Sequence, residues 1–227
     1  MNLKRIKFIL IILLVIIFSI SACMVGVLIK AQNNKEGILE NKIIYIDPGH
    51  GGKDDGASVD KVMEDEINLK ISGYLYEKLI SLGAYVLISR TSDYDLASLY
   101  QKNRKREDLK KRVDYINSSK PDIFISIHLN AYPSNNVSGA QVFYKNDDNS
   151  KRLSEIIQNQ LNVFTNKTRK NKLGDYYILN KTNPVGVLVE CGFLSNNEER
   201  VKLNNKDYQM KIADKIKNGI VEYFLEK

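Results

Sequence analysis

Cysteine, histidine and tryptophan are scarce in this sequence. Its 227 residues include no tryptophan, two cysteines and two histidines. Cys23 lies in an apolar N-terminal run and Cys191 lies far along the chain, so no disulfide is expected within a folded domain. The protein is therefore not one of the small secreted modules held together by disulfides. We expect Cys191 to be a small buried apolar residue, with a catalytic thiol as the less favoured alternative.

The sequence also lacks the features of a nucleic-acid-binding protein. It has no RNP-like segment and no recognisable helix-turn-helix, so nucleic acid is not an expected partner despite a net charge of +7. That charge suits either an ordinary basic surface or contact with another anionic polymer, such as teichoic acid or anionic lipid. A hydrophobic content of 43% is enough for a packed core.

Charge is absent from residues 8–29, an apolar run that follows the basic start MNLKRIK. The run is long enough to span a bilayer, and the basic residues before it predict that the following chain is exported. Residues 1–30 are thus predicted to be a transmembrane anchor or signal segment, with the rest of the chain membrane-associated outside the cytoplasmic membrane. Ile20-Ser21-Ala22-Cys23 resembles a bacterial lipobox, so lipidation of Cys23 and cleavage after Ala22 are alternatives. The apolar run continues past Cys23, which favours a retained anchor.

Beyond a polar linker at 31–41, strand-like and helix-like segments alternate through residues 42–227. Strands are predicted at 43–47, 84–89, 122–128, 139–144 and 186–190. Helices are predicted at 64–82, 104–118, 149–164 and 207–226, with a further helical segment before the last. Such alternation predicts a single α/β domain, with a mostly parallel, twisted sheet covered by helices on both faces.

Four residues that can carry chemistry fall at the ends of these elements. His50 follows the first strand, His128 closes the third, Glu190 closes the last, and Glu64 opens the helix after the His50 loop. Ligands of open α/β sheets bind at the carboxyl ends of strands, so these side chains can converge. Two histidines and a carboxylate are a common ligand set of a catalytic zinc, which leaves one position for water. Glu190 is then placed to move the proton of that water.

Each of these residues also has a simpler explanation. The glycines around His50 suit an ordinary turn, and Glu64 suits the N-terminus of any helix. Asp65 and Glu66 would serve that purpose equally, so spacing alone does not choose among the three acids. A structural role is less favoured for Glu190, because a carboxylate that ends a buried strand costs free energy unless it is paired.

The segments DPGHGGKDDGA, EDEINL, SIHLNA and VECGFLSN resemble, in order, the four motifs of the zinc-dependent N-acetylmuramoyl-L-alanine amidases of the amidase-3 group. The resemblance covers about residues 42–225. It implies an amidase-3 catalytic domain over 42–227, with Zn²⁺ bound by His50, Glu64 and His128, and with Glu190 as the catalytic glutamate. Glu64 is selected because the family's zinc-binding glutamate precedes an Asn-Leu pair by four residues.

The resemblance also implies three substrate-binding residues. Asn130 occupies the position beside the second histidine, Arg90 matches an arginine after the second strand, and Arg112 lies in a Leu-x-x-Arg element, where it contacts substrate or supports the structure. The family's usual glycine shortly before the zinc glutamate is missing, because the loop reads SVDKVMED. We therefore expect a departure from the family in the geometry of that loop.

Within this family the chain is similar to the sporulation amidases of the CwlD type. That similarity implies cleavage of the amide between N-acetylmuramic acid and L-alanine of peptidoglycan. It further implies a role in the spore cortex, where a partner deacetylase completes muramic-δ-lactam for germination. The domain would then lie outside the cytoplasmic membrane, with the forespore–mother cell intermembrane space as one location, and an activating protein is a further candidate partner. The alternatives are a zinc peptidase that cuts within the stem peptide and a non-catalytic, membrane-tethered wall-binding protein.

Overall fold

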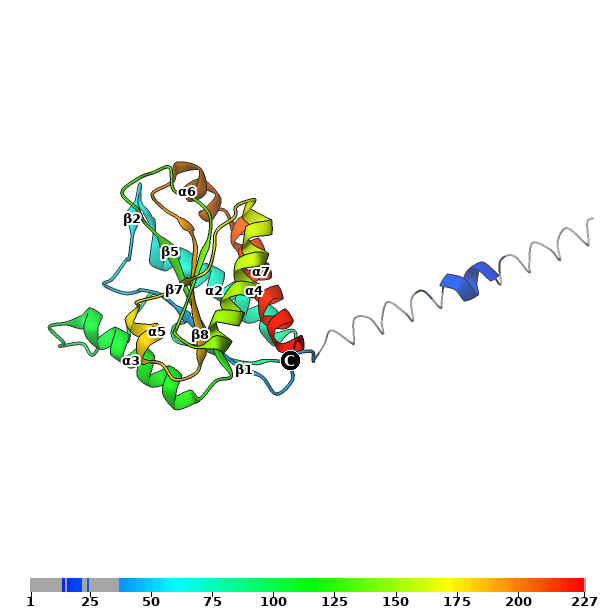
Figure 1. Cartoon of the computed structure of the whole chain (residues 1–227), viewed down its shortest axis with the longest axis horizontal. Coiled ribbons are helices and arrows are strands. Elements are labelled where there is room, and N and C mark those ends of the chain that lie inside the picture. The colour runs from blue at the N-terminus through cyan, green and yellow to red at the C-terminus, as the bar shows by residue number, and fades with distance from the viewer. Residues whose placement is uncertain (1–13, 15, 22–23, 25–36, 227) are drawn as a thin grey trace, which may run out of the picture. The chain divides into compact units, whose positions relative to one another are not determined.

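A computed structural model of the chain describes residues 14, 16–21, 24 and 37–226 (Figure 1). The apolar run predicted to cross a membrane falls largely outside these residues, as do Ala22 and Cys23. The described residues of the run are helical, and no helix in the described part of the chain is both long and apolar enough to span a bilayer. A retained anchor, a cleaved signal and a lipidated cysteine therefore stay predictions.

The residues from Leu39 onward form one compact unit built on a six-stranded sheet. Its strands follow the order β4-β1-β5-β8-β6-β7. Their bounds are β1 Ile43–Pro48, β4 Tyr85–Ile88, β5 Ile123–Asn130, β6 Gln141–Tyr144, β7 Lys172–Leu173 and β8 Val185–Phe193. The first four strands of that order run parallel, and β6 runs antiparallel to β8. The central strands are buried on both faces, as their continuous apolar runs require.

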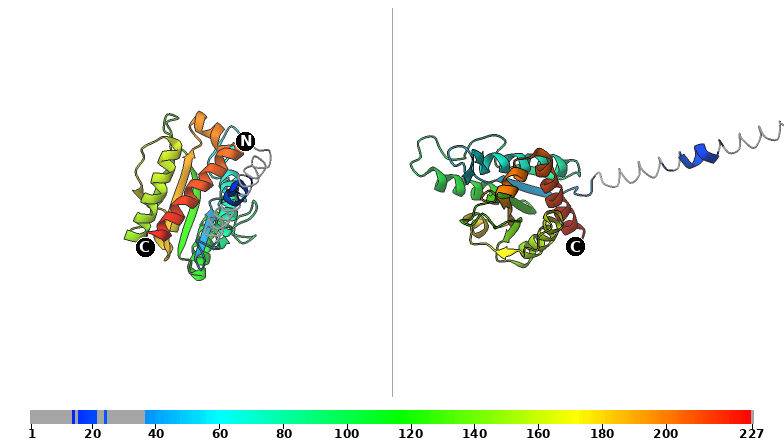
Figure 2. Two further views of the ribbon diagram at one scale, coloured as in Figure 1. Left: turned by 90° about the vertical axis from the view of Figure 1, so that its right-hand side faces the viewer. Right: turned by 90° about the horizontal axis from the view of Figure 1, so that it is seen from above.

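Helices cover both faces of this sheet. Three long helices lie side by side on one face, with α7 between the other two (Figure 2). They are α2 Glu64–Ile80, α4 Asp148–Thr165 and α7 Lys206–Leu225. The other face carries α3 Arg104–Ser119 and the short α5 Tyr177–Lys181, while α6 Asn197–Leu203 follows β8 (Figure 1). Side-chain caps from asparagine or aspartate begin α3, α4, α6 and α7.

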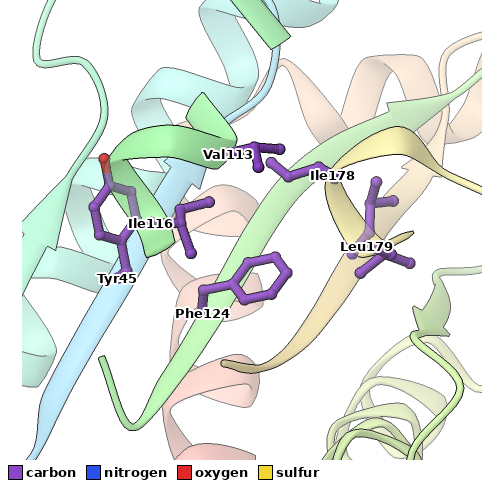
Figure 3. Close-up of a cluster of buried hydrophobic side chains, with 7 residues drawn as sticks. Tyr45, Val113, Ile116, Phe124, Ile178 and Leu179 are labelled. Carbon is purple, nitrogen blue, oxygen red and sulfur yellow. The ribbon is translucent and has the colours of Figure 1, made fainter. Parts of the chain in front are cut away.

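The core beneath α3 and α5 connects these helices to the strands that lead to the site. Side chains that alternate along β1, β5 and β8 point to this face and meet apolar residues of the two helices (Figure 3). The buried cluster consists of Tyr45, Val113, Ile116, Phe124, Ile178, Leu179 and Leu188. This packing fixes the positions of both helices beside the carboxyl ends of the central strands.

The structure confirms the predicted α/β domain with a mostly parallel sheet. It differs from the sequence expectation in its short elements. The hairpin of β2 Ser58–Val59 and β3 Val62–Met63, the strand β7 and the helix α5 were all missed. Each is too short to show a hydrophobic period, so its pattern cannot be read from the sequence.

Candidate metal centre and active site

The predicted site residues converge where the carboxyl ends of β1, β5 and β8 meet. His50 lies two residues beyond β1, and His128 and Glu190 are direct neighbours in the register of β5 and β8. Both strands continue a few residues past these positions, so neither residue closes its strand as expected. A cavity of about 310 Å³ opens here and is lined by His50, Glu64, His128 and Glu190 among others. The four residues therefore share one cavity.

Glu64 lies between the two histidines. Its Oε1 lies 3.0 Å from Nδ1 of His128 and 3.3 Å from Nε2 of His50. The same oxygen accepts a hydrogen bond from the backbone N–H of Leu129, and Oε2 accepts one from Ala57. Burial raises the pKa of this carboxyl, but the two histidines lower it by more, so the pKa lies well below its ordinary value. The carboxylate is thus held ionised at its place.

This arrangement has the chemistry of a metal site. One ligand atom from each of His50, Glu64 and His128 lies within 4.8 Å of the other two. The imidazole rings meet edge to face, with centroids 5.0 Å apart, so both rings can direct a nitrogen toward one point. A donor set of two imidazoles and a carboxylate suits Zn²⁺, which binds such ligands at about 2.0–2.2 Å. The residues present therefore fit the ion that the sequence predicted.

A carboxylate behind His50 fixes the orientation of its ring. Asp54 Oδ2 lies 3.0 Å from Nδ1 of His50, which leaves Nε2 facing Glu64. Burial lowers the pKa of His50, but the hydrogen bonds with Glu64 and Asp54 raise it by more, so the net pKa is about 8. Carboxylates in this position orient metal-binding histidines. Sequence analysis missed Asp54, although its spacing of four residues from His50 in GHGGKDD was a usable signal.

Glu190 lies on the strand beside His128 and has one carboxylate oxygen without a hydrogen-bond partner among the described residues. Its side chain is 6% exposed, and its Oε2 has no hydrogen-bond partner in the described part of the chain. Burial and the negative charge of Glu64 raise the pKa of Glu190 to about 8, against smaller opposing effects of His50 and of a hydrogen bond with Tyr176. A buried carboxyl group that faces a cavity and takes up a proton near neutral pH is suited to proton transfer.

Two tyrosines complete the cavity. Tyr176, the residue before α5, and Tyr177, its first residue, also line it. Burial, with the charges of Glu190 and Glu64, raises the pKa of Tyr176 to about 12, so its hydroxyl stays a donor. Sequence analysis did not predict these residues because α5 is too short to be recognised.

Of the three predicted substrate-binding residues, only Asn130 reaches the cavity. It is half-buried and lines the wall beside His128, so its substrate contact stays a prediction. Arg90 and Arg112 are 0% and 1% exposed and lie beneath the His50 loop. Their guanidinium groups donate hydrogen bonds to acceptors within the protein. We therefore assign both arginines to support of the loop and not to substrate contact.

The two arginines hold the backbone from which His50 projects. Arg90 donates to the carbonyls of Pro48 and Gly49, and Arg112 donates to those of Pro48 and His50. His50 itself has a φ of 60°, which is unfavourable for a residue with a side chain. The arginines therefore compensate a strained conformation that aims the imidazole into the cavity.

The loop that lacks the family glycine is the β2–β3 hairpin. Its two turn residues, Asp60 and Lys61, have φ values of 51° and 65°, so non-glycine residues adopt the left-handed conformation there. The Asp60 carboxylate lies 2.5 Å from the Arg200 guanidinium, which fixes the turn. Just before the hairpin, the carbonyl of Ala57 accepts a hydrogen bond from the backbone N–H of Glu64. The turn without a glycine is thus formed by two left-handed residues, and Glu64 stays hydrogen-bonded to the chain that precedes the hairpin.

Cys191 is buried beside Glu190, at 1% exposure. Burial and the nearby acids raise the pKa of its thiol well above the ordinary value, so a thiolate nucleophile is disfavoured. Cys191 is a small buried residue, as expected.

Comparisons with known proteins identify related sequences and structures. A sequence model described as N-acetylmuramoyl-L-alanine amidase matches residues 44–222. The germination-specific N-acetylmuramoyl-L-alanine amidase of Bacillus subtilis strain 168 is 46% identical over 197 residues, which cover 83% of this chain and 82% of that protein.

Solved structures show the same fold. The CwlD amidase of Clostridioides difficile, determined in complex with the GerS lipoprotein, is 39% identical with a TM-score of 0.80, over 82% of this chain and 100% of that one. An N-acetylmuramoyl-L-alanine amidase from Clostridium difficile 630 is 32% identical with a TM-score of 0.74, over 82% and 98% of the two chains.

Proposed function

This chain belongs to the N-acetylmuramoyl-L-alanine amidase family, and from that premise we propose a zinc-dependent hydrolase of peptidoglycan. It cleaves the amide between the lactyl group of N-acetylmuramic acid and the L-alanine of the stem peptide. The observation that carries this proposal is the convergence of three metal-binding side chains with a buried, partly unpaired carboxylate in one cavity.

The chain's own residues divide the work between binding and proton transfer. His50, Glu64 and His128 would hold the zinc ion, and Asp54 keeps the ring of His50 in orientation. When bound, zinc supplies a Lewis acid that polarises the amide carbonyl and lowers the pKa of the attacking water. Cavity walls formed by Asn130 and the tyrosines of α5 position the substrate.

Glu190 carries the proton in both directions. Its carboxylate accepts a proton from the attacking water and then delivers it to the departing amine of L-alanine. The Tyr176 hydroxyl, which stays protonated, stabilises the ionised form of Glu190 by a hydrogen bond.

We place this activity in the maturation of spore cortex. The support is the identity of 46% to the germination-specific amidase of Bacillus subtilis and the fold shared with CwlD. In this proposal the product is the substrate of a partner deacetylase that leads to muramic-δ-lactam. The catalytic domain would lie outside the cytoplasmic membrane, tethered by the segment before residue 31. Because the CwlD structure is a complex with a lipoprotein, an activating protein is a reasonable partner of this chain as well.

The experiment uses the full chain in mild detergent, loaded with zinc, on purified peptidoglycan. Mass spectrometry should find intact stem peptides with a free L-alanine amine, and a chelator should abolish their release. Shorter peptide fragments would instead identify a peptidase. Binding to peptidoglycan with no fragment released, in the presence of zinc and of a lipoprotein partner, would identify a non-catalytic wall-binding protein.

Glu190→Gln separates metal binding from proton transfer. The variant should keep stoichiometric zinc but lose about two to four orders of magnitude in turnover, the usual contribution of a positioned acid–base group. Normal turnover in this variant would overturn the assignment of Glu190.

His50→Ala and His128→Ala should each bind less than stoichiometric zinc. Stoichiometric zinc in both variants would overturn the ligand set.

A further inference from the structure

A second cavity adjoins the active-site cavity along the groove between α3 and α5. It has a volume of about 240 Å³ and is lined by Asn103, Lys105, Arg106, Leu109 and Tyr177. Leu109 and Tyr177 also line the active-site cavity, so the two cavities are neighbours at these residues. The shared wall is apolar and aromatic, and the far rim carries two cations. A chain that leaves the reaction centre along this groove therefore meets positive charge.

The acids near this groove are already paired with bases. Asp95 pairs with Arg104, Asp108 pairs with Arg112, and Asp54 pairs with His50 and Lys105; Glu107, on the same helix, pairs with Lys111. Arg106, in contrast, makes no ion pair or side-chain hydrogen bond with any residue that the structure describes. Its guanidinium group is exposed at the cavity, with all of its donors free for a ligand.

The cations lie close to the reaction centre. Lys105 Nζ lies 3.2 Å from Oδ2 of Asp54, and that same oxygen lies 3.0 Å from Nδ1 of His50. An extended peptide advances about 3.3–3.6 Å per residue. Lys105 Nζ therefore lies within about two peptide residues of His50, and Arg106 follows it in the chain and lines the same second cavity.

Neither cation stabilises the N-terminus of its own helix. Lys105 and Arg106 lie in the first turn of α3, where basic residues oppose the helix dipole. We propose that these residues form a subsite for a carboxylate of the stem peptide, namely that of the residue after L-alanine. The inference rests on the proposed amidase function and gives the departing peptide a direction, over Leu109 and Tyr177 toward α3.

The chemistry of the substrate supplies a direct test of this subsite. The residue after L-alanine is a γ-linked glutamate, whose α-carboxyl group is free in some peptidoglycans and amidated in others. A carboxylate accepts charge-assisted hydrogen bonds from Arg106 and Lys105, whereas the uncharged carboxamide does so only weakly. The enzyme should therefore distinguish two substrates that differ in this group alone.

The test compares two synthetic muramyl peptides, one with the free α-carboxylate and one with the α-carboxamide, on the zinc-loaded full chain. The wild type should prefer the carboxylate by about fivefold in kcat/KM, mostly through KM, as expected for an exposed charge pair. That preference should shrink as salt is added. Arg106→Gln should bring the ratio toward one, and Arg106→Glu should reverse it.

Lys110→Gln is the matched control, because Lys110 is an exposed cation on the same helix that lines neither cavity. It should keep the ratio of the wild type. Equal cleavage of both peptides by the wild type, or an unchanged ratio in Arg106→Glu, would overturn the subsite and leave the amidase in place. Failure to cleave either peptide would count against the proposed function itself, and the subsite would fall with it.

Discussion

Gly49 leaves the space that the ring of His128 occupies. A Cβ atom at this position would lie 2.2 Å from Cε1 and 2.3 Å from Nε2 of that histidine. No side chain tolerates such contacts, so the imidazole must move. The glycine before His50 is thus required by the second histidine of the site, which is far away in the sequence.

Gly49→Ala should therefore weaken zinc binding about 10–100-fold, the range found when the surroundings of metal ligands are disturbed. Competition with a chromophoric chelator measures the affinity. Gly73→Ala is the control, since a Cβ there has no atom within 4 Å, and it should keep the affinity of the wild type. An unchanged affinity in Gly49→Ala would mean that the ring of His128 has another position that still binds the metal.

Asp47 connects the sheet to the arginine that holds the His50 loop. Its buried carboxylate lies 2.7 Å from Nη1 of Arg112 and accepts hydrogen bonds from the hydroxyls of Ser89 and Ser126. Burial raises the pKa of Asp47, but Arg112 and the two hydroxyls lower it by more. The ionised form is therefore the form that stabilises the fold.

The Asp47→Asn variant should lose about 3–5 kcal/mol at pH 7, because the change leaves Arg112 buried with a single acid. The folded pKa is depressed, so the contribution of Asp47 is complete above its unfolded pKa of about 3.9 and is lost as pH falls through the folded pKa. The difference in the free energy of unfolding between wild type and variant should then become smaller as the pH is lowered. Urea unfolding in the presence of a chelator measures this difference. Asp114→Asn, at an exposed position on α3, should change stability by less than about 0.5 kcal/mol.

At the residue scale, the sequence was sufficient to predict the four residues that converge on the cavity and insufficient to predict the residues that support them. His50, Glu64, His128 and Glu190 were predicted because each lies in a recognisable motif at the end of an element. Arg90 was expected at the substrate but is buried under the loop. The sequence around an arginine does not indicate whether its hydrogen-bond partners are substrate atoms or backbone carbonyls. Only the fold distinguishes these two roles.

At the element scale, the long amphipathic helices and the buried strands were predicted to within three residues at each end. The continuous apolar runs of β1, β5 and β8 and the period of α2 carry that signal. The antiparallel pairing of β6 with β8 was not predictable. The direction of a strand depends on the path of the connection that precedes it, and the pattern of its own residues does not indicate that path. The β2–β3 hairpin was missed since its turn lacks the Asn-Gly or Asp-Gly pair that usually marks such a turn.

The turn of that hairpin can be improved. Lys61 has a φ of 65°, which costs a residue with a Cβ about 1 kcal/mol relative to glycine. Lys61→Gly should raise the free energy of unfolding by up to about that amount, with a higher urea midpoint. Lys61→Ala is the control and should give no gain, because alanine suffers the same strain. A loss of stability in Lys61→Gly would show that the lysine side chain contributes more than the backbone strain costs.

At the scale of the whole molecule, the metal site joins segments that are distant in sequence. His50 follows β1, Glu64 begins α2, and His128 lies in β5, so an ion bound by all three connects the sheet to the helix layer. An unfolded chain with two histidines has little comparable affinity, and binding is therefore coupled to folding. The hydrogen bonds within the site hold these segments together in advance, so zinc is expected to add stability to a domain that is already folded.

Thermal unfolding of the full chain measures this coupling. At a free zinc concentration of about one hundred times Kd, the folded state gains about 2.7 kcal/mol, which corresponds to a rise in Tm of roughly 5–10 °C for a domain of this size. Excess chelator should return Tm to its metal-free value. His128→Ala should show little or no rise, because two remaining ligands bind zinc weakly. An equal rise in His128→Ala and wild type would place the stabilising ion elsewhere on the protein, and no rise in the wild type would mean that His50, Glu64 and His128 do not bind zinc as a set.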